Sequence, residues 1–549
     1  MSRLRLDARL AARLAGRAAG ARLPGVAAAL ATGLALALAF SGPDLGPLAF
    51  CALVPLLLAV TAGQGAGPGG ARRAGALGYL AGVAFFAAHL WWIAIFGILA
   101  WVALTLVEAL AFAAFFALVP AASRRLGPWR FAVLPAAWAA LEWLRAHGPL
   151  GGFPWGLLGL SQHGGGPLLP LARVVGVYGL GAVIVVVNLA LAETVRAAAG
   201  RRRLPTLGWP ALAAALALCG LLAPAPPPPD RDASPLRLAL VQASVPPGDR
   251  RENRAATIQA VFDRHLRMTR ALAGAPAPDL IVWGEGAIDD DPFAARNADR
   301  LAAIRAALRA VGAPLLAGAT TDRGPDHFAT EALLFDADGS LTDRYAKRRL
   351  VPFGEYVPGG DLMRALVPPT RQVPYDKLPG TRLAPMRLDG VRIGTVICYE
   401  SAYAEDARRL ARDGAQVLLV LTTNASYGYS PASRQHLASS QLRAVEEGRT
   451  VVHAAESGIT AVVGPDGVAR PRTGLYQQTT VQALVAPRSG LTLYARFGHQ
   501  LELGLLAVAF AGLAATVAPR RRTAGSVGRP RPTGAASPPT PVTVRRGAP

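Results

Sequence analysis

The stretch VRIGTVICYES (391–401) is a short apolar run followed by a cysteine, a tyrosine, a glutamate and a serine. Apolar, β-branched runs of this length, bounded by polar residues, are typical of buried strands. Similar runs recur in LRLALVQASV (236–245), DLIVWGEGAI (279–288), PLLAGAT (314–320), EALLFDADG (331–339), AQVLLVLTTNAS (415–426), TVVHAAESGITAVVGPDG (450–467) and TVQALVA (480–486). Between them, 252–273, 292–311, 403–413 and 432–447 are predicted as helices. Strands that alternate with helices indicate a layered α/β domain, here over residues 232–490.

The composition around this segment is that of a membrane protein. Hydrophobic residues make up 52% of the 549 residues and charged residues only 17%, against a usual charged share of about 25%. The mean hydropathy is +0.32. These values exclude a chain disordered throughout and a simple cytosolic enzyme. They predict a polytopic α-helical membrane domain joined to a soluble α/β domain.

Apolar stretches long enough to cross a bilayer predict about eight spans. They lie at 24–41, 46–62, 74–96, 98–120, 131–146, 172–194, 207–224 and 500–518. Arginine runs occupy alternate loops, so the positive-inside rule places both termini in the cytoplasm and residues 232–490 outside it. We therefore expect a basic cytoplasmic leader (1–23), seven spans (24–224), an extracytoplasmic domain (232–490), an eighth span (500–518) and a disordered cytoplasmic tail (519–549).

The strong positive charge does not indicate nucleic acid. The net charge is +22, but the arginines cluster between apolar segments, which is the pattern of membrane topology. Lys347 and Lys377 are the only lysines. In an arginine-rich chain a lysine can persist by chance, or because a compact amine is needed. Lys377 lies in the proline-bounded stretch VPYDKLPG (373–380), which is predicted to run over the surface and to carry no chemistry.

Three cysteines are present, and one of them lies outside the apolar segments. Cys51 and Cys219 lie within long apolar stretches, where a cysteine acts as a small hydrophobe. Cys398 is the only cysteine of the polar segment, so it has no disulfide partner there. It is a candidate nucleophile, with a buried packing thiol as the alternative.

Three polar residues follow predicted strands and form a possible nucleophilic set: Glu285, Lys347 and Cys398. In open α/β sheets, ligands gather at strand ends. A carboxylate can take the proton of a thiol, and an ammonium group can stabilise the thiolate and a developing oxyanion. Two alternatives stay open: Glu285 is an ordinary strand-end acid, and Lys347 belongs to a basic patch that meets lipid headgroups. The other members of that patch are Arg344, Arg348 and Arg349.

The order and flanking sequences of these residues resemble a known family. VWGEGAI (282–288), KRRLVPFGEYVP (347–358) and ICYES (397–401) are similar to motifs of the nitrilase, or carbon–nitrogen hydrolase, superfamily. That resemblance implies an αββα sandwich with a Glu–Lys–Cys triad. With the predicted spans and LEWLRAHGPLGGFPWGLLGLSQ (141–162), residues 25–518 resemble the bacterial apolipoprotein N-acyltransferase family.

The resemblance implies a role for each residue of the set. Glu285 would be the general base, Cys398 the nucleophile and Lys347 the cation beside the oxyanion. Glu355 would help to position the triad. Tyr399 and Glu400 match the residues that follow the nucleophile, and the N–H of Tyr399 would help to bind the oxyanion. For Glu355 and Glu400, a buried ion pair with a neighbouring arginine is the alternative.

The implied reaction transfers an acyl chain from a membrane phospholipid, through a thioester, to the N-terminal α-amine of diacylglyceryl-cysteine in apolipoproteins. No metal or organic cofactor is implied, and the enzyme is expected to be a monomer in the inner membrane. Alternatives are a membrane-tethered amidase that hydrolyses a lipid-linked or small amide, and a non-catalytic scaffold. Two segments depart from the family: PPGDRREN (246–253) has no tryptophan, and NASYG (424–428) stands where Asn-Asp-Ala-Trp-Phe is common.

Overall fold

The computed structural model describes residues 24–62, 68–199, 215, 218–244, 254–373, 375–518 and 547. The predicted leader, most of the predicted span 207–224, the segment 246–253 and nearly all of the predicted tail lie outside these residues. Residues 1–516 form one unit and residues 517–549 a second. The elements described below belong to the first unit, except for Val517, the last residue of the last helix.

The N-terminal half and the end of the described chain are helical. The helices are an apolar helix at Pro24–Leu38, η1 (Gly46–Phe50), α2 (Val54–Ala62), α3 (Pro68–His89), η2 (Trp91–Ile95), α4 (Ile98–Arg125), α5 (Arg130–His147), α6 (Ala172–Ala199) and α14 (Leu493–Val517). Among the described residues, three helical stretches are long and apolar enough to cross a membrane: Ile98–Arg125, Leu169–Ala199 and Leu493–Val517. The eight predicted spans are therefore not confirmed as a set.

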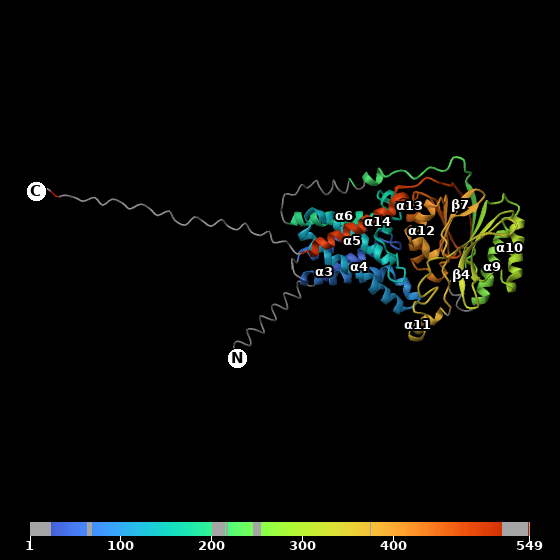
Figure 1. The fold of residues 1–549 in the computed structure, drawn as a ribbon, viewed down its shortest axis with the longest axis horizontal. Helices are drawn as coiled ribbons and strands as arrows, with labels where there is room; N and C mark the ends of the chain where they lie inside the picture. Colours follow the sequence, from blue (N-terminus) through green and yellow to red (C-terminus); the bar gives the residue numbers. More distant parts are fainter. Residues whose placement is uncertain are drawn as a thin grey trace. The chain divides into compact units, whose positions relative to one another are not determined.

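α14 returns from the far end of the sequence to the N-terminal helices. Ala509 of α14 packs with Ala136 and Ala137 of α5. Gly512 lies so close to Val133 that an added Cβ would be 2.1 Å from its Cγ1. Figure 1 shows α14 running alongside α5 and α6. The helical part is thus built from both ends of the described chain.

Residues 236–485 contain two six-stranded mixed sheets. The first has the order β12-β1-β2-β3-β4-β5, with β12 (Thr479–Val485), β1 (Leu236–Gln242), β2 (Leu280–Ile288), β3 (Leu315–Asp322), β4 (Phe328–Phe335) and β5 (Leu341–Ala346). The second has the order β11-β10-β9-β8-β7-β6, with β11 (Ala469–Arg472), β10 (Ala461–Val463), β9 (Val451–Ala455), β8 (Val417–Thr422), β7 (Val391–Ile397) and β6 (Met386–Leu388). In each sheet three neighbouring strands are parallel and the outer strands are antiparallel.

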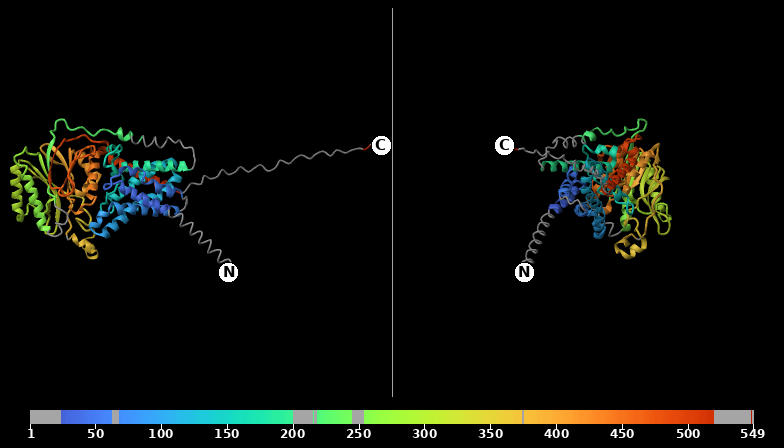
Figure 2. Two further views of the ribbon diagram at one scale, coloured as in Figure 1. Left: turned by 180° about the vertical axis from the view of Figure 1, so that it is seen from behind. Right: turned by 60° about the vertical axis from the view of Figure 1, so that its left-hand side comes forward.

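The two sheets face each other between two pairs of helices. Leu240 of the first sheet and Leu419 of the second belong to one buried apolar core. The helices α9 (Arg254–Arg270) and α10 (Ala298–Val311) cover the outer face of the first sheet, and α12 (Ala404–Arg412) and α13 (Ala432–Glu447) cover that of the second (Figures 1 and 2). The predicted α/β layering is confirmed, in the order helix, sheet, sheet, helix.

The helix pair α12 and α13 lies against the apolar helices of the N-terminal half. A single apolar core contains Phe85 and Trp138 of those helices together with Tyr399 and Leu442 of the α/β part. The N–H of Val177 in α6 donates to the Glu446 carboxylate of α13 at 2.7 Å. The helical and α/β parts therefore share buried contacts, and the end of β7 lies near their junction.

Candidate active site

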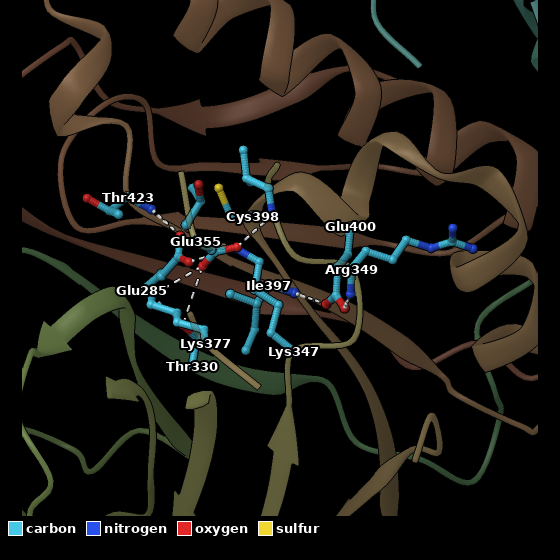
Figure 3. Close-up of polar contacts among 12 residues, drawn as sticks. Glu285, Thr330, Lys347, Arg349, Glu355, Lys377, Ile397, Cys398, Glu400 and Thr423 are labelled. Atoms are coloured by element: carbon cyan, nitrogen blue, oxygen red, sulfur yellow. Dashed lines mark hydrogen bonds and ion pairs between the residues drawn. The ribbon is translucent and has the colours of Figure 1, made fainter. Parts of the chain in front are cut away.

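Glu285, Lys347 and Cys398 come from three different strands. Glu285 lies in β2, Lys347 directly follows β5, and Cys398 directly follows β7. Lys347 Nζ lies 3.1 Å from Glu285 Oε1. The Lys347 side chain is 1% exposed, and the whole Cys398 residue 7%. The charges of Glu285 and Lys347 both act on the Cys398 thiol, so the fold gathers the three predicted residues in one buried place (Figure 3).

Two glycines make room around Glu285, Gly284 toward the facing sheet and Gly318 toward the neighbouring strand β3. A Cβ on Gly284 would lie 2.3 Å from the Glu456 nitrogen of the facing sheet. A Cβ on Gly318 of β3 would lie 2.5 Å from the Glu285 Cα. Such contacts are shorter than non-bonded carbon atoms tolerate, so both positions exclude larger residues. On the other side, Thr423 N donates to Glu285 Oε2 at 3.2 Å.

Glu355 joins the set through two lysines. Its Oε2 lies 2.9 Å from Lys347 Nζ and its Oε1 3.2 Å from Lys377 Nζ. Lys377 Nζ also donates to Thr330 Oγ1 at 2.7 Å, and its side chain is 29% exposed. The sequence predicts a surface position for Lys377, but its side chain is partly buried and contacts Glu355. That Lys377 carries no chemistry of its own stays a prediction. The proline-bounded stretch turns back onto β4, where Leu378 N donates to Phe328 O at 2.7 Å.

The ionisation of these groups follows from their burial and from one another's charges. Burial alone would lower the pKa of Lys347, but Glu285 and Glu355 outweigh it and hold that pKa well above its usual value. Burial would raise the pKa of Glu355, but Lys347 and Lys377 lower it to about 2. Burial, and then the Glu285 charge, raise the pKa of the Cys398 thiol to about 12. The resting site therefore holds a neutral thiol beside a charged lysine.

The backbone of Cys398 is strained and held by side chains. Its φ is +53°, in the left-handed region that non-glycine residues seldom adopt. Ser401 Oγ donates to the Cys398 carbonyl oxygen at 3.0 Å, and His436 Nε2 donates to the same atom at 2.9 Å. Burial lowers the pKa of His436 to about 4, so its ring is neutral at pH 7. Strain of this kind persists where the surroundings over-determine it.

Glu400 ties the lysine segment to the cysteine segment. Its carboxylate accepts hydrogen bonds from Ile397 N at 2.7 Å, from Arg348 N at 2.7 Å and from the Tyr345 hydroxyl at 2.8 Å. Burial raises its pKa to about 7 against the lowering effect of the Ile397 and Arg348 N–H groups. The contacts come from backbone N–H groups and a hydroxyl, and Glu355 pairs with lysines. The alternative that these two glutamates pair with arginines is wrong.

The arginines next to Lys347 also have protein partners. The guanidinium groups of Arg348 and Arg349 contact Asp406 at 3.2 Å and 2.5 Å. Arg349 also lies over the Tyr403 ring, 4.0 Å from its centroid. These two side chains pair with residues of α12 or next to it, so they do not form a free basic surface for lipid headgroups.

Tyr399 connects the segment of Cys398 to the helical part. Its hydroxyl donates to the Gly152 carbonyl at 2.8 Å. Its ring stacks with Trp155 at a centroid distance of 6.3 Å. Both partners lie in the stretch 141–162 that the sequence singles out. The residue after Cys398 is thus hydrogen-bonded to, and stacked on, the chain between α5 and α6.

A second contact between the two parts is centred on Gln435 of α13. Its Oε1 accepts hydrogen bonds from the indole N–H groups of Trp92 at 3.0 Å and Trp155 at 2.9 Å. The Tyr427 ring meets Trp92 edge-on at 5.0 Å between centroids. Burial raises the pKa of Tyr427 well above its usual value.

Sequence reasoning missed His436, Gln435, Tyr345 and Lys377. The first two are polar residues of α13 that are fully or almost fully buried, and a buried polar residue signals a specific partner. No sequence pattern identifies that partner. All three cysteines are free, and Cys398 is the buried one. Among the described residues, no group of three or more His, Cys, Asp or Glu side chains could hold a metal ion.

Comparisons with known proteins match both parts of the chain. Residues 32–190 match the apolipoprotein N-acyltransferase N-terminal domain, and residues 237–490 match the carbon–nitrogen hydrolase domain. The apolipoprotein N-acyltransferase of Geobacter metallireducens is 32% identical over 511 residues, which cover 88% of this chain and 93% of that protein. The apolipoprotein N-acyltransferase of Ralstonia nicotianae is 32% identical over 479 residues, 82% of this chain and 86% of that protein. A solved amidase from Nesterenkonia sp. aligns with a TM-score of 0.32 and 21% identity, covering 48% of this chain and 93% of that chain.

Proposed function

The chain belongs to the apolipoprotein N-acyltransferase family, and from that premise we propose the reaction that its site performs. An acyl chain passes from a membrane phospholipid to Cys398 and then to the N-terminal α-amine of diacylglyceryl-cysteine in an apolipoprotein. The observation that carries this proposal is the contact of Tyr399, the neighbour of the nucleophile, with the stretch between α5 and α6. Because the segment that carries the thiol packs against apolar helices, the thiol can react with a lipid ester without the lipid leaving the membrane.

The first half-reaction forms the thioester. Glu285 takes the proton of the Cys398 thiol as Sγ attacks the ester carbonyl carbon of the phospholipid. The raised pKa of the thiol fits a proton transfer that accompanies the attack rather than a thiolate at rest. Lys347 and the Tyr399 N–H stabilise the oxyanion. When the tetrahedral intermediate collapses, the lysophospholipid oxygen leaves with the proton from Glu285.

The second half-reaction releases the acyl chain to the amine. The neutral α-amine attacks the thioester carbonyl, and Glu285 takes one of its protons. Cys398 leaves as a thiolate and recovers that proton from Glu285. Glu355 and Glu400 act as positioning residues. Glu355 holds the Lys347 ammonium. Glu400 accepts hydrogen bonds from the N–H of Arg348, next to Lys347, and from the N–H of Ile397, next to Cys398.

An apolar wall near the thiol supports an acyl chain as the transferred group. Tyr427 packs edge-on against Trp92 and Phe96 of the helical part. The Trp92 ring lies 5.9 Å from that of Trp155, centroid to centroid, and Trp155 stacks on Tyr399, the residue after Cys398. Trp91, Phe96, Ile98 and Leu99 nearby in the sequence are all more than a third exposed. These side chains would cover the first carbons of an acyl chain and limit the entry of water, which favours an amine over water as the second nucleophile.

The topology remains part of the proposal. The arginine pattern places both termini in the cytoplasm and the α/β domain outside. A reporter that is active only outside the cytoplasm should be active when fused after residue 230. Activity from a fusion at residue 70 together with silence at 230 would reverse the orientation.

The intact mass of the purified protein tests the reaction directly. Incubation with phosphatidylethanolamine vesicles should add one acyl mass, removed by hydroxylamine and located on Cys398 by peptide mapping. A diacylglyceryl-cysteine peptide should then discharge the adduct and gain the same mass. If the adduct released free fatty acid without the peptide as fast as it is discharged when the peptide is present, the protein would be a hydrolase instead.

The other two cysteines provide matched controls. Cys398→Ala should abolish the adduct, whereas Cys51→Ala and Cys219→Ala should leave its rate nearly unchanged, because neither residue belongs to the site. Full activity in Cys398→Ala would refute the mechanism.

A further inference from the structure

We propose that Lys377 is a positioning residue of the active site: its ammonium holds one oxygen of Glu355, which leaves the other oxygen to hold Lys347 beside Glu285. This inference deepens the proposed function and rests on it for the role of Cys398. It assigns a role to the second of the two lysines.

The four groups form an alternating chain of charges. Glu285 and Glu355 each contact Lys347, at 3.1 Å and 2.9 Å, and Lys377 contacts the remaining oxygen of Glu355 at 3.2 Å. Glu355 is therefore shared by two cations through different oxygens. Figure 3 shows Lys377 and Lys347 reaching Glu355 from different elements.

The backbone keeps Lys377 in this place. Lys377 N donates to Glu355 O at 2.8 Å, so the two residues are joined by main chain as well as side chain. Three residues later, Gly380 N donates to Lys347 O at 2.8 Å. A Cβ on Gly380 would lie 2.2 Å from the Ala346 oxygen, which shows how closely this segment follows the Lys347 strand end. The segment is thus fastened beside both partners.

The charge balance gives the contact its consequence. Without Lys377, two carboxylates would face one ammonium, and the buried set would carry a net charge of −1. A negative charge near a thiol opposes formation of the thiolate. It would also make Glu355 easier to protonate, because Lys377 is one of the two lysines that lower the pKa of that carboxyl. With Lys377 in place the four charges sum to zero. Because Lys377 also pairs with Glu355, Lys347 stays shared between Glu355 and Glu285.

Lys377→Met removes the charge and keeps most of the side-chain length. The rate of Cys398 alkylation at fixed pH should fall by roughly threefold to tenfold, since a neighbouring charge shifts an ionisation by about one unit and the half-buried position weakens the effect. The acid limb of the pH–rate profile should move to higher pH by about half a unit. Lys377→Arg keeps the charge and should stay within about twofold of the parent.

Iodoacetamide alkylation measures this without any lipid. The parent is the full chain carrying Cys51→Ala and Cys219→Ala, so that Cys398 is the only thiol. Arg382→Met is the matched control, because it removes a largely exposed cation five residues away that pairs with Asp343. Lys377→Gln is a second variant in case the methionine disturbs folding. Glutamine also removes the charge, but its amide can still donate a hydrogen bond to Glu355. Phospholipid acylation is followed in the same proteins.

The outcomes separate the two proposals. Slow alkylation in Lys377→Met and Lys377→Gln, with recovery in Lys377→Arg, supports the role of Lys377 even if no variant is acylated by phospholipid. In that case the proposed acyl transfer alone would fail. Equal alkylation rates and pH profiles in all variants, or an equal loss in the arginine and methionine variants, would overturn the role of Lys377.

Discussion

Glu355→Gln tests whether the buried chain of charges contributes to stability as its geometry predicts. The two lysines lower the pKa of Glu355 from its usual value of 4.5 to about 2. Because the folded state holds the anion, the contribution is present above pH 4.5 and is lost as the pH falls toward 2. A shift of this size corresponds to about 3 kcal/mol of unfolding free energy at neutral pH. The side chain is only 10% exposed, so screening by solvent does not reduce it much.

The expected change can be followed between pH 7 and pH 3.5. Over that range the linkage removes about 1.5 kcal/mol, somewhat less than half of the whole contribution. For a cooperative unit of the size of the α/β domain, this corresponds to a fall in Tm of about 3–6 °C. Glu355→Gln has no carboxyl to protonate, so its Tm should start lower at pH 7 and should fall by that much less on acidification.

The assay is thermal unfolding of the purified protein in detergent, followed by intrinsic fluorescence at several pH values. Asp361→Asn is the control, because it removes a carboxylate whose side chain is fully exposed. An acid-induced fall in Tm that is identical in the parent and in Glu355→Gln would refute the view that the lysines hold Glu355 as an anion.

Three further variants address the nucleophile and its supports. Lys347→Arg replaces an ammonium that is buried between two carboxylates. The rate of thioester formation, measured by mass in a single turnover, should fall about 100-fold or more. A rate within threefold of the parent would show that Lys347 does not stabilise the oxyanion. His436→Leu deletes a donor to the strained Cys398 carbonyl, so the rate of alkylation by iodoacetamide should fall about tenfold or more while α13 stays folded by circular dichroism; an unchanged rate would mean that Ser401 alone holds the turn. Gln435→Leu leaves two buried indole N–H groups without their acceptor at about 1–3 kcal/mol each, and Tm should fall by several degrees; an unchanged Tm would show that the indoles find other partners.

The central strands could be predicted because their physical signal is strong. β8 is buried along its whole length and β7 at every residue except Arg392, so both are marked by apolar runs, which lead to Thr422 and Cys398. The edge strands β5 and β11 are half-exposed and polar, so no apolar run marks them. The stretch 450–467 reads as one strand but forms β9 and β10, because the turn between them is rich in small residues.

The candidate site divides in the same way. Apolar strands mark both Glu285, which lies in β2 of the first sheet, and Cys398, which follows β7 of the second. Their meeting depends on how the two sheets face each other, and no local sequence pattern encodes that packing. Lys377 could not be placed, because its position depends on a loop that returns to Phe328 and Lys347, and local turn residues do not encode that return. The buried partners of α13 likewise depend on which helices it meets, since its own sequence is largely polar.

The scarcity of lysine makes this protein open to selective chemical labelling. Apart from the N-terminal α-amine, the only primary amines are those of Lys347 and Lys377, and both contact Glu355. Lys347 is 1% exposed and Lys377 29% exposed, so an amine-selective reagent meets Lys377 first. A fluorescent or cross-linking ester can therefore be delivered to the edge of the proposed active site without first introducing a new reactive residue. Any lipid that occupies the site should protect this amine, so the extent of labelling becomes a measure of occupancy.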